Sequence, residues 1–119
     1  MLLPMNKAIA KRISLENHLS LEALRSGRGS EHQFNGMCQA AYIASFLYEA
    51  GFGPAREGLF DEVEQVLLRC RGAAIETNTW RIDEEDYRLL AEIVTLHDTQ
   101  CAIAPVCELI RANERLKMM

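Results

Sequence analysis

Residues 30–51 read SEHQFNGMCQAAYIASFLYEAG, and this stretch decides the fold class. Ser30 can accept a hydrogen bond from the backbone N–H of Gln33, while the Gln33 side chain reaches back to the N–H of Ser30. This reciprocal pairing is a capping box, which marks the start of a helix. Apolar side chains then recur at helical spacing until Gly51, which suits the left-handed residue that ends a helix. More than one face of this helix is apolar, which indicates a central position in a bundle or in a subunit interface.

Three further helices are marked by boundary signals of the same kind. Proline fits the first position of a helix, glycine fits the residue just past its end, and aspartate fits the N-cap. These signals predict helices over residues 6–26, from Pro54 to Gly72, and from Asp83 onward.

Pro105 interrupts the apolar pattern of the last of these helices. Proline removes a backbone hydrogen bond and clashes with the preceding turn, so the helix must kink or split there, and helical spacing resumes over about 105–117. Residues 72–82 are expected to be a loop that Trp80 and Ile82 pin to the core. The chain is therefore predicted to be all-α, a compact up-and-down bundle of four main helices, the last one kinked or split at Pro105.

The length of 119 residues predicts one domain, with residues 1–5 as a disordered N-terminal extension and residues 6–119 as the bundle. Apolar residues make up 49% of the chain and charged residues 25%, as in ordinary globular proteins. A chain of this size buries about two-thirds of its unfolded surface, so it can be stable without metals or disulfides.

The net charge of −4 argues against a generally basic nucleic-acid binder. The four cysteines form no Cys-x-x-Cys pair, and the chain shows no secretory leader pattern and no apolar run near the roughly 20 residues that span a bilayer. These features predict a reduced, cytoplasmic protein, away from membranes, whose cysteines pack as small hydrophobic residues.

Side chains that could carry chemistry are few. His97 and Cys101 are four residues apart and share a helix face, and with His18 on the first helix they are weak candidates for metal ligands if the two helices pack in register. The same pair is the only local candidate for a nucleophile and its base, but one helix face supplies no oxyanion hole. We therefore predict no enzymatic activity, no catalytic residues and no cofactor.

Four stretches of the chain resemble a family of small, largely uncharacterised proteobacterial proteins: HLSLEALR (18–25), GRGSEHQF (27–34), AGFG (50–53) and LHDTQ (96–100). Such proteins are common on plasmids and prophages and are sometimes loosely labelled Fis-type transcriptional regulators. The resemblance implies an accessory protein of a mobile element, and it assigns no catalytic or binding residue. The chain has no C-terminal helix-turn-helix pattern that would support the regulator label.

The function predicted from these features is that of a small interaction or regulatory protein that binds another protein and acts as a homodimer. The dimer is expected because the helices have more apolar faces than a four-helix monomer can cover. The candidate interface residues are Tyr42, Phe46, Leu47, Ile93 and Leu96.

Two alternatives remain open. An inhibitor of a host defence complex, similar in action to an anti-CRISPR protein, would use an acidic surface made by Glu57, Asp61, Glu62, Glu64, Glu84, Glu85 and Asp86. A DNA-binding transcriptional regulator would contact phosphates through basic residues that share a face near the C-terminus, namely Arg111, Arg115 and Lys117.

Overall fold

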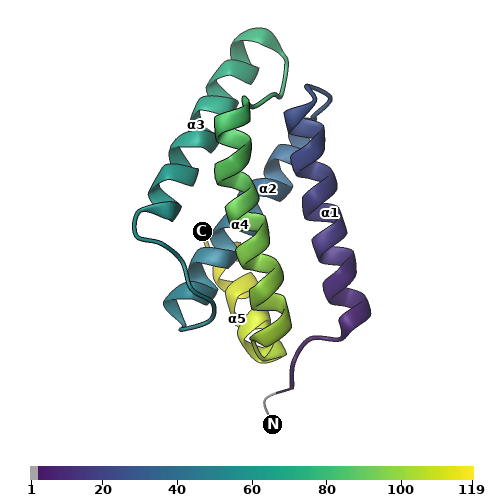
Figure 1. Cartoon of the computed structure of the whole chain (residues 1–119), viewed down its shortest axis with the longest axis vertical. Coiled ribbons are helices and arrows are strands. Elements are labelled where there is room, and N and C mark those ends of the chain that lie inside the picture. The colour runs from purple at the N-terminus through teal and green to yellow at the C-terminus, as the bar shows by residue number, and fades with distance from the viewer. Residues whose placement is uncertain (1–2) are drawn as a thin grey trace.

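Five α-helices form the computed structural model, which describes residues 3–119 (Figure 1). These residues contain no strand beyond isolated bridges, which confirms the all-α prediction. Helices α1 to α4 run alternately in opposite directions, and α5 packs on α2, behind the lower part of α4 in the view of Figure 1. The helices are α1 (Lys7–Arg25), α2 (Glu31–Glu49), α3 (Leu59–Thr77), α4 (Glu84–Ile103) and α5 (Val106–Lys117).

The central position predicted for the second helix is confirmed, because α2 packs against each of the other four helices. Its capping box is present. The Ser30 N–H donates to Gln33 Oε1 at 3.0 Å, and the Gln33 N–H donates to Ser30 Oγ at 3.3 Å. The interior faces of α2 carry small and medium side chains, including Ala40, Ala41 and Ala44, which let neighbouring helices approach closely.

The prediction of four main helices is corrected to five. At Pro105 the backbone is extended, with φ −61° and ψ 147°, so α4 ends at Ile103 and α5 is a separate helix. The new helix packs on α2, where Leu109 and Ala112 join a second apolar cluster with Leu47 and Cys101.

The predicted boundaries of the third helix are wrong at both ends. Pro54 lies in the loop, and α3 begins at Leu59 after Gly58, whose φ of 82° makes a turn that glycine tolerates. Gly72 does not end the helix. Helix α3 continues to Thr77 and stops at Asn78, which adopts a left-handed φ of 58°, since asparagine is a common alternative to glycine at a helix end.

The connection from α3 to α4 is anchored as predicted, although it is shorter. The rings of Trp80 and Phe34 lie 4.8 Å apart, and Ile82 is buried in the main core. Asp83 caps α4 by accepting a hydrogen bond from the backbone N–H of Asp86 at 2.7 Å.

Residues 3–5, part of the predicted N-terminal extension, lie against the start of α5. The Val106 N–H donates to the Leu3 carbonyl at 2.7 Å, and Met5 packs on the second apolar cluster. Residues 1–2 lie outside the described residues. Over the part of the chain that the structure describes, no helix has the length and apolar character needed to cross a membrane.

Candidate protein-binding groove

A groove of about 450 Å³ lies between α2 and α3. It exists because these two helices contact each other only over a short stretch, while α3 packs mainly on α4. Its floor is apolar and is made by side chains of the main core, with aromatic rings at both ends. The floor and end residues are Phe34, Ala41, Phe60, Val63, Leu67 and Trp80.

The α2 side of the groove is a regular seam of side chains. Asn35, Cys38, Tyr42 and Ser45 all line the groove, and Glu31 begins the same row. Their spacing alternates between four and three residues, which is the spacing of a helix face that packs along another helix. This seam is only partly covered by the bundle, so α2 has a face on which Cys38 and Tyr42 alternate with polar side chains and which the monomer leaves partly open.

The α3 side of the groove has a matching seam. Asp61, Glu64, Leu68 and Arg71 line the groove at spacings of three, four and three residues. Leu68 is 54% exposed and lies on this seam between the charged residues Glu64 and Arg71. Two neighbouring helices thus direct heptad-like seams into one open space.

The charges on the α3 seam are uneven along the groove. Asp61 and Glu64 lie toward the start of α3, whereas Arg71 lies two turns further along. Within residues 3–119 none of these three side chains forms an ion pair, so their charges are available at the groove rim. The groove is therefore negative at one end and apolar in the middle.

The seven residues of the predicted acidic surface do not form one continuous face. Asp61 and Glu64 border the groove, but Glu84, Glu85 and Asp86 begin α4 at the opposite end of the α3–α4 pair (Figure 1). Two of the carboxylates are also neutralised. Arg56 binds Glu62 at 2.6 Å, and Arg69 binds Asp86 at 2.9 Å, while Glu57 is exposed in the loop before α3.

The predicted dimer interface separates into two kinds of residue. Leu47, Ile93 and Leu96 are buried within the monomer, so their side chains leave no surface for a second copy. The prediction that these three residues form a dimer interface is therefore wrong. Ile93 and Leu96 belong to the main core, and α5 covers the face of α2 that holds Leu47. Tyr42 is 39% exposed and lines the groove, and Phe46 lies half-buried beneath the guanidinium of Arg115, 4.0 Å from its ring centroid.

The basic residues near the C-terminus each have an acidic partner. Arg115 binds Glu49 at 2.7 Å, and Arg111 binds Glu108 at 2.8 Å. Lys117 lies 3.8 Å from Glu114. These pairs reduce the positive potential that phosphate contacts require.

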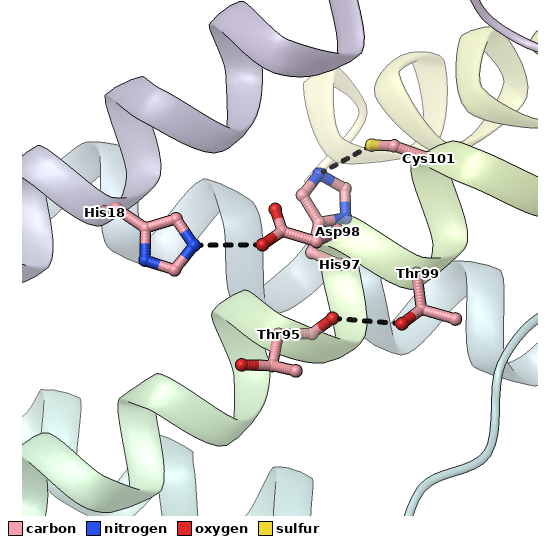
Figure 2. Close-up of polar contacts among 6 residues, drawn as sticks. All are labelled: His18, Thr95, His97, Asp98, Thr99 and Cys101. Atoms are coloured by element: carbon pink, nitrogen blue, oxygen red, sulfur yellow. Dashed lines mark hydrogen bonds and ion pairs between the residues drawn. The ribbon is translucent and has the colours of Figure 1, made fainter. Parts of the chain in front are cut away.

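The candidate metal ligands do not converge. His18 Nε2 lies 2.9 Å from Asp98 Oδ2 across the α1–α4 interface, whereas His97 lies toward Cys101, with 3.8 Å between Nε2 and Sγ (Figure 2). Among residues 3–119, no three His, Cys, Asp or Glu side chains are arranged to hold a metal ion. Burial raises the pKa of the Cys101 thiol to about 11, which favours the protonated form, a weak nucleophile.

The His97 side chain instead belongs to a buried polar chain. Gln100 donates through Nε2 to the carbonyls of Ala44 and Phe52, at 2.8 and 3.2 Å, so its Oε1 is left to accept. The partner of Oε1 is His97 Nδ1 at 3.3 Å, which assigns the proton to Nδ1 and leaves Nε2 to accept from Cys101. Burial lowers the pKa of His97, which agrees with a neutral ring.

The groove was not predicted from the sequence, since its two seams belong to different helices. Of its residues Tyr42, Asp61 and Glu64 were predicted as surface-site residues, on different surfaces, and Trp80 was predicted only as an anchor of the loop before the last long helix. No protein-family model, curated protein or solved structure matches the chain.

Proposed function

We propose that this chain is a small, non-enzymatic protein-binding protein with a regulatory role, and that its α2–α3 groove receives an α-helix of the partner. The observation that carries this proposal is the pair of seams with heptad-like spacing on α2 and α3, which border one open groove with an apolar floor. A third helix laid between two such seams completes the packing that helices of a bundle adopt.

The dimensions and charges of the groove describe the helix that fits it. The α2 seam runs from Glu31 to Ser45, which corresponds to about 21 Å at 1.5 Å per residue, or roughly four helical turns. The floor favours an apolar stripe on the bound helix. Asp61 and Glu64 favour Lys or Arg at the end of that helix lying over the start of α3, together with its positive N-terminal dipole end.

A designed peptide tests this proposal directly. The probe is an 18-residue amphipathic helix with leucines at heptad positions and lysines in its N-terminal half, compared with a peptide of scrambled order. Trp80 lines the groove and is the single tryptophan of the chain, so its fluorescence reports on binding there. We expect the ordered peptide to bind in the micromolar range and the scrambled peptide to bind at least tenfold more weakly.

Two substitutions on α3 give a matched control. Leu68 lines the groove, whereas Ile75 is exposed on the same helix outside it. Leu68→Asp should weaken peptide binding at least tenfold, and Ile75→Asp should leave it unchanged. Equal effects of the two substitutions, or equal binding of the two peptides, would refute the groove as the binding surface.

No comparable structural observation favours the two alternative functions, the DNA-binding regulator and the inhibitor of a host defence complex. A DNA-binding regulator would have to release Arg111, Arg115 and Lys117 from their acidic partners. An inhibitor that uses an acidic surface would act through the groove-side carboxylates alone.

A further inference from the structure

The outward face of α1 has the chemistry that the groove requires. Leu15 and Leu19 are one turn apart on this face and are 59% and 58% exposed. Lys11 and Arg12 are exposed in the turn before them, and neither forms an ion pair within residues 3–119. This face of α1 is therefore basic toward the N-terminus and apolar in its middle.

The spacing on α1 matches the spacing on α3. Arg12 and Leu19 are separated by about two helical turns, and so are Asp61 and Leu68. When α1 of one molecule lies parallel to α3 of another, Arg12 meets Asp61 in the same register that brings Leu19 onto Leu68. Lys11 then lies at the same acidic end of the groove, near the first turns of α3.

We propose that the helix that occupies the groove is α1 of a second copy of this chain. The inference rests on the proposed function, because it uses the same groove. It requires no unfolding, since α1 keeps its inner face, with Leu21 and Leu24, buried in its own bundle. Reciprocal insertion of the two α1 faces closes the assembly as a two-fold dimer.

Charge complementarity distinguishes this occupant from a generic apolar contact. In this register Arg12 faces Asp61 and Leu19 faces Leu68, while Leu15 lies beside Glu64 between these two pairs. Opposite charges at a contact favour the correct register, and a shift of one heptad toward the end of α3 is disfavoured because it brings Arg12 within one turn of Arg71.

Sedimentation velocity on the full chain, over a concentration series from about 1 to 200 µM, tests the proposal. We expect a concentration-dependent dimer that weakens as salt is raised. The double variants K11E/R12E and D61K/E64K should each weaken dimerisation at least tenfold. Their combination in one chain should restore it, because the charge pairs are reformed with reversed sign.

The control is R111E/K117E, which reverses two exposed charges on α5 and should leave the dimer unchanged. All these positions are exposed, and circular dichroism and thermal melting of each variant verify that it is folded. A protein that stays monomeric, a dimer insensitive to both reversals, or a combined variant without recovery would overturn the proposal. Binding of the designed peptide by a monomeric protein would still support the proposed function, whereas failure of the peptide to bind a monomer would remove both.

Discussion

Gln100→Met is expected to be among the most damaging single changes in the core. Gln100 is fully buried, and its side chain joins α4 to α2 and to the loop after α2. Methionine has a similar length and flexibility, so the substitution removes the hydrogen bonds with little change in side-chain volume. The effect therefore isolates the polar contribution of this side chain.

The magnitude follows from the groups left without a partner. His97 Nδ1–H loses its hydrogen bond in a buried setting, and the carbonyl of Phe52 loses one in a partly buried setting. The carbonyl of Ala44 lies within α2 and has an intrahelical donor, so its loss is smaller. An unsatisfied buried group costs about 1 to 3 kcal/mol and a partly buried one costs less, so the two losses together predict a decrease of about 2 to 4 kcal/mol in the free energy of unfolding. That is a large fraction of the 5 to 15 kcal/mol typical of a small domain.

Urea unfolding followed by Trp80 fluorescence measures this loss. With a denaturant dependence of about 1 to 3 kcal/mol per molar urea, the midpoint should fall by roughly 1 to 3 M. Gln65→Met is the matched control, because Gln65 is exposed on α3 and the same substitution there should change stability by less than about 0.5 kcal/mol. If Gln100→Met costs no more than the control, the buried polar chain does not stabilise the fold.

Three further predictions concern single residues. Burial lowers the pKa of His97 below its ordinary value of 6.5, so below pH 6.5 the unfolded chain takes up a proton that the native state does not, and stability falls until the lowered pKa is reached. The urea midpoint should therefore fall less steeply with decreasing pH in His97→Gln than in the unmodified protein, whereas the exposed-site control His32→Gln should keep the pH dependence of the unmodified protein. Gly36→Ala should raise the free energy of unfolding by about 1 kcal/mol, because the nearest heavy atom to an added Cβ is 4.0 Å away. Gly29→Ala should lower the free energy of unfolding by about 1 to 3 kcal/mol, because its Cβ would lie 2.6 Å from a leucine side-chain carbon and 2.9 Å from a backbone oxygen. A higher melting temperature for Gly29→Ala would contradict the close packing there. Asp83→Ala should cost about 1 kcal/mol and Asp83→Asn much less, and equal melting temperatures for the two variants would show that the cap contributes nothing.

The helix boundaries that could be predicted were those set by a local side-chain contact or by a left-handed glycine just past the helix end, such as Gly51. Ser30 and Asp83 each bind a backbone N–H three residues ahead, and three-residue contacts are visible in the sequence. Pro54 misled the prediction because proline at the first helical position is permitted rather than required. The loop instead continues to the left-handed turn at Gly58, and α3 begins where Leu59 packs into the core.

The site was harder to predict than the fold for a related reason. A seam such as Asn35–Ser45 has the same spacing whether a neighbouring helix covers it or solvent does. Which helices approach one another depends on Pro105, because the split there sends α5 onto one face of α2 and leaves the α3 face open. The burial of Leu47 and the exposure of Tyr42 both follow from that arrangement, which no local pattern encodes.

The loose attachment of α3 also affects how the molecule fluctuates. Whereas α2 is held by four neighbours, α3 rests on α4 and touches α2 only briefly, so it can separate from the bundle at a lower free energy than global unfolding. Its amide hydrogens should therefore exchange with solvent before those of α2 and α4. Any molecule that fills the groove would bridge α3 to α2 and slow amide exchange along the whole of α3, so binding would protect amides well beyond the residues that contact the bound molecule.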